Sequence, residues 1–308
     1  MLDLVGKRYW YFLISLIVII PGAIALLLGW LRLSIDFTGG TLWELRFESA
    51  VQPGEVRSVL TQQGHGDALV QTAEGNIVLV RLKEIKEGSA EKATIADALR
   101  QQIGPFTELR LETVGPTVGE EVRTRAIGAV ALASVAILAY IAWNFRKVKN
   151  PIVYGACAII AMLHDVLVTV GVFALLGQFA GVEVDALFVT ALLTVVGFSV
   201  HDTIVVFDRI RENQIRRVPG TFEEVVNYSL LQTVARSVAT SLTVVFTLLA
   251  LFLFGGTTTR TFVLALLIGV VSGTYSSIFN ASQLLVVWET GEWRTWFRRG
   301  RQTSAVAP

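Results

Sequence analysis

The stretch GFSVHDTIVVFDRIRE, residues 197–212, continues a nearly pure apolar segment that begins at Ala186. Two adjacent ionisable residues, His201 and Asp202, nevertheless lie inside it. An apolar segment of this length predicts a helix that crosses a membrane, where charged side chains are costly and usually functional. The composition agrees with a membrane protein, because 53% of the 308 residues are hydrophobic and 17% are charged, against about 25% charged in an average soluble domain.

Apolar segments long enough to cross a membrane occur six times in the chain. They cover residues 9–31, 125–143, 152–176, 186–207, 234–254 and 261–288. The first follows Lys7 and Arg8, but it has the length of a full span and no small-residue cleavage site after it. We therefore interpret it as an uncleaved helix rather than a signal peptide.

The spans divide the chain into four parts. These are the N-terminus with the first helix, one extracytoplasmic domain, five further helices and a basic cytoplasmic tail, at residues 1–31, 32–122, 123–290 and 291–308. The fold class expected is thus an α-helical polytopic membrane protein with one domain inserted between its first two helices.

Lys and Arg residues in the short loops predict the orientation of the spans. If the N-terminus is cytoplasmic, the cytoplasmic segments carry thirteen of them: Lys7, Arg8, Arg146, Lys147, Lys149, Arg209, Arg211, Arg216, Arg217, Arg294, Arg298, Arg299 and Arg301. The two short loops on the other side carry Arg260 alone. We therefore expect both termini in the cytoplasm and residues 32–122 outside it.

The polar segment 32–122 has the pattern of one α+β domain. Strands are predicted at 41–47, 67–72, 76–82 and 106–114, and helices at 53–63 and 89–103. The order βαββαβ is that of a ferredoxin-like domain. In the last strand, Leu109, Leu111 and Thr113 are predicted to lie on one side. Such a fold says little about function by itself.

Other charged residues accompany His201 and Asp202 at membrane depth: His164 and Asp165 in the third span, Asp208 and Arg209 at the end of the fourth, and Arg236 in the fifth. Asp202 lies about 9 Å of helix inside the cytoplasmic boundary, too far for its short side chain to reach water. For Asp208 and Arg209 an interfacial, structural role weighs more. For His164 a hydrogen bond to a neighbouring helix weighs as much as a functional role.

Small and hydroxyl residues repeat at helical spacing along the later spans. The stripes are Asp165 and Thr169; Thr190, Thr194, Gly197 and His201; Arg236, Thr240, Thr243 and Thr247; and Gly269, Gly273, Ser276 and Asn280. Small residues alone indicate close helix packing, but packing does not require an Asp on one helix and an Arg on another. We therefore expect helices three to six to surround a narrow polar path.

Protonation is the chemistry that these residues offer. Burial raises the pKa of a carboxyl group and a neighbouring Arg lowers it, so an Asp202–Arg236 pair can be poised to bind and release a proton. Protonation of Asp202 would break the pair and shift the preferred helix packing. The sequence has no metal-ligand cluster, phosphate-binding loop or nucleophile–base set, and Gly39-Gly40 lacks the strand–helix context of a dinucleotide site. No metal, cofactor or ATP hydrolysis is expected, and a net charge of +1 gives no indication of nucleic acid.

Three motifs carry a family resemblance: Asp36-Phe-Thr-Gly-Gly40 after the first span, GFSVHDTIVVFDRIREN at 197–213 and LLQTVARSVATSLT at 230–243. With the six-span layout, they resemble the SecF branch of the SecD/SecF family, within the RND superfamily of proton-driven transporters. The resemblance covers essentially the whole chain. The family commonly has Asn where this chain has His201, which leaves the Asp intact and adds a titratable neighbour.

The resemblance implies an accessory subunit of the Sec translocase in the bacterial cytoplasmic (inner) membrane. With SecD, such a subunit uses the proton motive force to promote preprotein translocation and release on the outer side. The partners implied are SecD, the SecYEG channel, SecA, YajC, the translocating preprotein and membrane lipid.

The resemblance also assigns residues. Asp202 and Arg236 match the family's proton relay. His201, Asp165 and His164 are further candidates for the relay because they are ionisable residues inside the spans, not because the family assigns them. Asp36, Phe37, Thr38, Gly39 and Gly40 form the other signature, which we interpret as a turn that needs the permissive backbone of its glycines. A hinge between the first span and the domain, and a merely structural turn, both stay open.

Two other functions stay open: half of an RND-type small-molecule or lipid exporter, and a scaffold that only stabilises the translocon. Exporters usually carry two large outer domains and twelve spans, and a scaffold does not need Asp202 and Arg236. Six spans supply half of the repeated symmetry expected of such transporters, so a partner of similar layout is implied. Sodium in place of protons, and the stoichiometry, also stay open.

Overall fold

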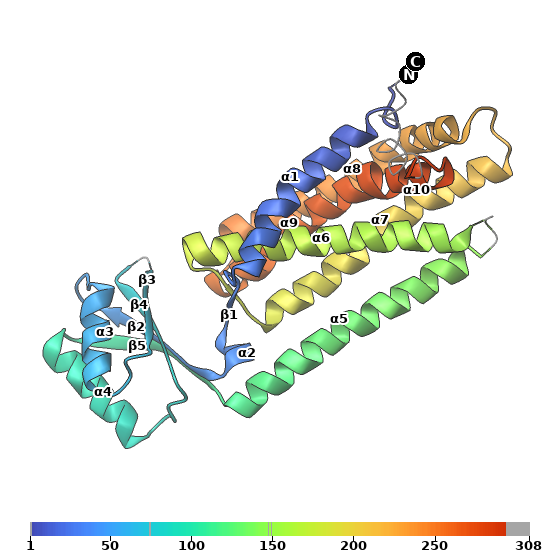
Figure 1. The fold of residues 1–308 in the computed structure, drawn as a ribbon. Helices are drawn as coiled ribbons and strands as arrows, with labels where there is room; N and C mark the ends of the chain where they lie inside the picture. The colour runs from blue at the N-terminus through green and yellow to red at the C-terminus, as the bar shows by residue number, and fades with distance from the viewer. Residues whose placement is uncertain (1, 74, 147, 149, 294–308) are drawn as a thin grey trace, which may run out of the picture. The chain divides into compact units, whose positions relative to one another are not determined.

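The computed structural model describes residues 2–73, 75–146, 148 and 150–293. These form two compact units: an α+β domain, Leu33–Gly128, and a membrane unit built from the residues on either side of it (Figure 1). The greater part of the basic tail predicted at 291–308 lies outside the described residues.

Six helices of the described chain are long and apolar enough to cross a membrane, as predicted. They are α1 (Arg8–Leu27), α5 (Pro116–Asn144), α6 (Pro151–Ala180), α7 (Ala186–Ile215), α8 (Phe222–Phe254) and the run Thr259–Glu289. Several extend beyond the predicted apolar runs because polar turns continue the helix to a cap. In α8, Thr221 and Glu224 form a capping box well before the apolar segment begins.

The last span is not one regular helix. α9 (Thr257–Ser276) continues into a π-helical turn, η1 (Ser277–Ala281), and then into α10 (Ser282–Glu289). The sequence predicts an unbroken helix here because the turn contains neither Pro nor Gly. Single π-helical turns are rare, and they occur frequently at functional sites.

Glycines bring two pairs of helices in the membrane unit into close contact. A Cβ atom at Gly22 of α1 would lie 2.8 Å from the Cα of Gly171 of α6. A Cβ atom at Gly269 of α9 would lie 2.1 Å from Val195 Cγ2 of α7, and one at Gly273 would lie 3.1 Å from the Cβ of Ser199. The predicted small-residue face of the last span is therefore a packing seam against α7.

The α+β domain has the element order βαββαβ that the sequence predicts. Its elements are β2 (Gly40–Phe47), α3 (Pro53–Gln62), β3 (Leu69–Ala73), β4 (Ile77–Leu82), α4 (Ala90–Gln102) and β5 (Phe106–Val114). The strands pair antiparallel in the order β3-β4-β2-β5. Trp43, Leu45 and Phe47 alternate along β2 and form the buried core with residues of both helices. Three short elements complete the chain: β1 (Arg32–Leu33), α2 (Ile35–Thr38) and β6 (Glu183–Val184).

The predicted sidedness of β5 is wrong at Leu109. Glu44 of β2 lies opposite Arg110, but the next residue, Leu45, lies opposite Glu108. Leu109 is therefore the extra residue of a β-bulge, and it is 38% exposed. A bulge depends on the partner strand, so the alternation within β5 alone does not reveal it.

Candidate functional site

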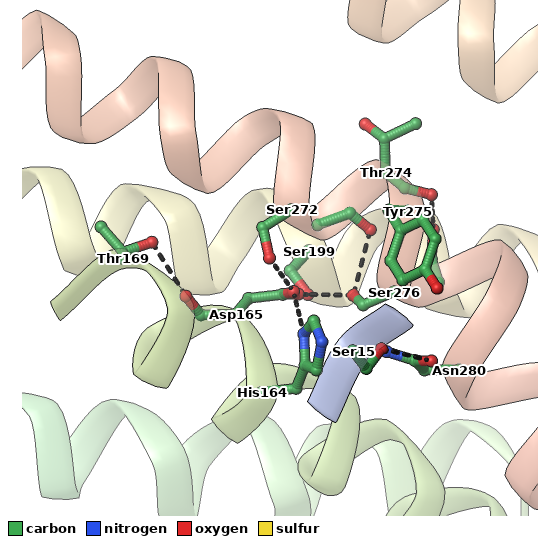
Figure 2. Close-up of polar contacts among 12 residues, drawn as sticks. Ser15, His164, Asp165, Thr169, Ser199, Ser272, Thr274, Tyr275, Ser276 and Asn280 are labelled. Atoms are coloured by element: carbon green, nitrogen blue, oxygen red, sulfur yellow. Dashed lines mark hydrogen bonds and ion pairs between the residues drawn. The ribbon is translucent and has the colours of Figure 1, made fainter. Parts of the chain in front are cut away.

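Asp165 of α6 is a carboxylate enclosed by the membrane unit, with 0% of its surface exposed. Three serine hydroxyls donate to it: Ser199 of α7 at 2.5 Å, Ser272 of α9 at 2.7 Å and Ser276 of α9 at 2.6 Å (Figure 2). The Nδ1 of His164 lies 2.9 Å from its Oδ1. Each carboxylate oxygen thus has two partners, which fills the four acceptor positions of an ionised carboxyl group. We call these five residues the Asp165 cluster.

The close seam between α7 and α9 assembles this cluster. Ser272 and Ser276 lie four residues apart and therefore share one face of α9. Gly273 lies between them and lets Ser199 of α7 approach to contact distance. A buried acid costs free energy unless hydrogen bonds compensate for the lost water. The small residues of the seam therefore position the donors that Asp165 requires.

Asp202 of α7 is a second buried acid, 3% exposed, and its surroundings differ. Its Oδ1 lies 3.8 Å from Nδ1 of His201, and its Oδ2 has no hydrogen-bond partner among the described residues. Ser241 of α8 lies beside the carboxyl group. The hydroxyl of Ser237, one turn earlier on α8, also lacks a partner within the described chain. The site at Asp202 therefore has polar groups without hydrogen bonds, whereas Asp165 is saturated.

The expected pair of Asp202 and Arg236 is not formed in this structure. No ion pair among the described residues joins their side chains. Arg236 is exposed and lines a pocket of about 190 Å³, near the predicted cytoplasmic end of α7, together with Asp208 and Glu212. Asp208 itself is paired with Arg211. A direct Asp202–Arg236 contact would require movement of the exposed Arg236 side chain or of the helices that carry the two residues.

Two of the predicted polar stripes face outward rather than into the membrane unit. The exposed residues are Thr190, Thr194, Gly197 and His201 on α7, and Arg236, Thr240, Thr243 and Thr247 on α8. The hydroxyls of Thr240, Thr243 and Thr247 donate to carbonyls of their own helix. The buried polar face of α8 is instead Thr233, Ser237 and Ser241.

The expectation that helices three to six enclose these stripes is therefore wrong for this chain alone. The stripes of α6 and α9, with Asp165, Thr169 and Ser276, are buried as expected. The hydroxyls of α8 do repeat at helical spacing, but the predicted stripe lies on the exposed face of the helix. A second row of hydroxyls lies on the buried face, and the sequence alone does not say which face is buried. Polar faces exposed at membrane depth suit contact with protein better than contact with lipid.

The signature Asp36–Gly40 forms a tight joint within the α+β domain. Asp36, Phe37 and Thr38 lie in the one-turn helix α2, and β2 begins at Gly40. Gly39 and Gly40 have φ values of 70° and 120°. A Cβ atom at Gly39 would lie 2.8 Å from the Cα of Pro116, where α5 begins, and one at Gly40 would lie 2.7 Å from the carbonyl oxygen of Leu82. The turn therefore needs glycine at both positions, as predicted.

Sequence reasoning missed four serines that contact or flank the buried acids: Ser199, Ser272, Ser237 and Ser241. The two on α8 follow Thr233 at four-residue spacing, and Ser272 lies within the glycine stripe of the last span. A buried Asp needs several donors. The presence of Asp165 in an apolar span therefore predicts hydroxyl donors on the neighbouring helices, and pairs of serines four residues apart are the pattern that would have revealed them.

The chain matches two protein-family models. Residues 94–291 match "Protein export membrane protein SecD/SecF, C-terminal", and residues 24–51 match "SecD/SecF GG Motif". The first match includes both buried acids, and the second includes the Asp36–Gly40 joint.

Two curated relatives match over their whole length. A protein translocase subunit SecF from Thermobaculum terrenum is 60% identical over 316 residues, covering 99% of this chain and 100% of the relative. One from Anaerolinea thermophila is 48% identical over 310 residues, with coverages of 99% and 100%.

Two solved structures have the same fold. SecDF from a Thermus species, described as a translocon-associated membrane protein, matches with a TM-score of 0.82 and 36% identity. The match covers 94% of this chain and 39% of that chain. SecDF in a super-membrane-facing form matches with a TM-score of 0.67 and 35% identity, covering 97% and 40%. The chain thus spans about two fifths of the SecDF chains that it matches.

Proposed function

Because the chain belongs to the SecD/SecF family of protein export membrane proteins, we propose that it acts as an accessory subunit of the Sec protein translocase. Full-length relatives named as translocase subunits support this function, as does the fold shared with SecDF. The chain is a multi-pass membrane protein. We assign it to the bacterial cytoplasmic membrane, with both termini in the cytoplasm and the α+β domain outside, on the distribution of Lys and Arg.

SecD is the partner that we propose for the exposed polar faces of α7 and α8. A row of hydroxyls, His201 and Arg236 on these faces would be costly in lipid. The matched SecDF chains are more than twice as long as this one, which supports a second, similar half. SecYEG, SecA, YajC and the preprotein are further partners that we infer from the family. The subunit acts as a transport component without a catalytic site, metal or cofactor of its own.

Proton movement through Asp202 is the energy source that we propose. The observation that carries this proposal is a carboxyl group only 3% exposed at membrane depth, with one oxygen free of hydrogen bonds in the described chain. Ionisable groups inside a membrane protein mark ion pathways by default. Arg236 does not contact Asp202 here, so the relay needs a second conformation in which the two side chains meet. Protons, rather than sodium, are the coupling ion.

Translocation of a preprotein into membrane vesicles that contain this chain together with SecD and the SecYEG channel tests this relay. The variant Asp202→Asn should lose the stimulation that an imposed proton gradient gives, while it still co-purifies with SecD. Asp208→Asn is the matched control, because it makes the same change on the same helix at a residue paired with Arg211. Undiminished stimulation in Asp202→Asn would refute the assignment. Stimulation by a sodium gradient at constant pH, without a proton gradient, would refute the choice of ion.

A further inference from the structure

We propose that the Asp165 cluster is a second proton-binding site, and that protonation of Asp165 is transmitted to α1 when Ser276 leaves the carboxylate and η1 releases the contact of Asn280 with Ser15. This inference rests on the proposed function, because a proton-driven cycle must deliver the proton. It differs from the relay at Asp202 in its residues and in the helix that responds.

Ser276 is the donor that can leave Asp165 most readily. An ionised carboxylate accepts at all four of its positions, whereas a protonated one carries an O–H group that must itself donate. When the proton lies on Oδ2, whose two partners are Ser199 and Ser276, one of these serines must turn away or become an acceptor. The Ser276 Oγ already lies 3.2 Å from the carbonyl oxygen of Gly273 in its own helix. Within the described chain, the hydroxyls of Ser199 and Ser272 donate only to Asp165.

The π-helical turn begins at the residue after Ser276, and it carries the contact with α1. Asn280 lies inside η1. Its Nδ2 lies 2.8 Å from the Oγ of Ser15, and its Oδ1 lies 3.1 Å from the same oxygen (Figure 2). Both side chains are buried. A π turn holds one more residue than an α turn, so conversion to α-helix rotates the residues after it by about 100° relative to those before it, and residues near its end, such as Asn280, by most of that angle. That rotation would break the Asn280–Ser15 contact.

A second hydrogen bond ties the same part of α9 to α1. The Tyr275 hydroxyl donates to the carbonyl oxygen of Tyr11 at 2.8 Å. Ser276 therefore lies between the two links that hold α1, and the ring of Tyr275 stacks on His164 with centroids 6.4 Å apart. Along the chain, α1 leads within a few residues to the Asp36–Gly40 joint of the α+β domain. The change at Asp165 thus reaches the helix that precedes the family's signature turn.

Few other ionisable groups lie near this site, and not all of them face it. On the elements packed against α6 they are, at the depth of the cluster, Tyr11 of α1, His201 and Asp202 of α7 and Tyr275 of α9. Among the described residues, His164 is the ionisable side chain in hydrogen-bonding contact with Asp165.

Distances between spin labels on α1 and α6 test the proposal in the reconstituted SecD complex. Leu27 and Ile152 are 88% and 83% exposed, so cysteines at these positions do not disturb the core. The buried Cys157 is replaced by Ala in the parent and in every variant, so that its loss is common to all. Lowering the pH from neutral to acidic values should add a second distance component. Asp165→Asn should show that component at both pH values, and so should Ser276→Ala, which keeps the acid. Ser134→Ala, whose hydroxyl donates to its own helix at Val130, should behave like the parent.

The outcomes separate this inference from the proposed function. A distance distribution that ignores pH in the parent and is unchanged in Ser276→Ala overturns the inference, even if Asp202→Asn still abolishes gradient-driven export. A pH-dependent component that persists unchanged in Ser15→Ala overturns the assigned link to α1. A component that follows Asp165 and Ser276, in a complex whose export ignores the proton gradient, supports proton binding in the Asp165 cluster and refutes proton movement as the energy source.

Discussion

Removing the hydroxyl of Ser199 should destabilise the membrane unit measurably. Ser199→Ala takes one of two donors from Oδ2 of Asp165 and leaves Ser276 as its remaining partner. A hydrogen bond to a charged group contributes about 1.5–3 kcal/mol. The loss of a single oxygen atom leaves little cavity, so we expect about 2 kcal/mol from the hydrogen bond alone. For a unit of about 200 residues, this corresponds to a fall in melting temperature of about 4–8 °C.

Thermal unfolding in detergent, followed by tryptophan fluorescence, measures this change. Ser134→Ala is the matched control, because its hydroxyl lies on a membrane span and donates to the carbonyl of Val130 in its own helix at 2.8 Å. Its melting temperature should fall by about 2 °C or less, as for substitutions away from buried networks. If Ser199→Ala and Ser134→Ala have the same melting temperature, the buried Asp165 does not depend on its serine donors for stability.

Two double variants sharpen the same test. Ser199→Ala with Ser276→Ala removes both serines that donate to Oδ2, whereas Ser199→Ala with Ser272→Ala removes one donor from each oxygen. Each double variant removes two hydroxyls. Residues that share one partner are coupled, so the first combination should cost more than the sum of its single variants. Equal losses from the two double variants would show that the carboxylate does not hold its donors as described.

Three further predictions concern other parts of the chain. Gly39→Ala should destabilise the α+β domain by about 1–3 kcal/mol in thermal melts, because it places a Cβ 2.8 Å from Pro116 Cα at positive φ. Gly64→Ala, also at positive φ but with open space around the new Cβ, should cost less, and equal losses would contradict the role of the clash. Burial alone raises the pKa of Glu292, but hydrogen bonds from Arg8 and Tyr9 outweigh it and hold the pKa below its usual 4.5. Its contribution to stability is therefore present above about pH 4.5 and is lost as the pH falls through the lowered pKa; Glu292→Gln should flatten melting-temperature curves in that acidic range, and curves that match the parent's would contradict the contact. His201, 72% exposed and 3.8 Å from Asp202, should shift the pH profile of export when changed to Asn, and an unchanged profile would remove it from the relay.

The sequence predicts the elements better than their contacts. Span number follows from apolar length, and the order of the α+β domain follows from local periodicity and caps such as Ser89, whose hydroxyl caps α4. The burial of Asp202 also follows, because its short side chain lies far from the helix end. What could not be predicted depends on neighbours: Thr233, Ser237 and Ser241 of α8 are buried, whereas Thr240 and Thr243 are not. The period of a stripe is local, but its phase depends on which helix packs against it.

The π-helical turn and the bulge at Leu109 could not be predicted from the sequence, for the same reason. Each inserts one residue without a marker in composition, and each is stabilised by contacts from elsewhere in the fold. In η1 the contact is Asn280 with Ser15, more than 200 positions away in the chain. In β5 it is the register with β2. Pairs of this kind can be recognised only once the elements are assembled.

The close crossing of Gly22 and Gly171 fixes a point, the pivot, about which α1 can tilt against α6. With backbone against backbone at this crossing, the two helices have no side chains there to yield, so α1 can tilt about the crossing more easily than it can slide. Ser15 lies seven residues before the pivot and Leu27 five residues after it, arms of about 10 Å and about 7 Å at 1.5 Å per residue. For a rigid α1, a displacement near Ser15 would return at Leu27 reversed in direction and reduced to about two thirds of its size, and a bend at Pro21, one residue before the crossing, would reduce it further.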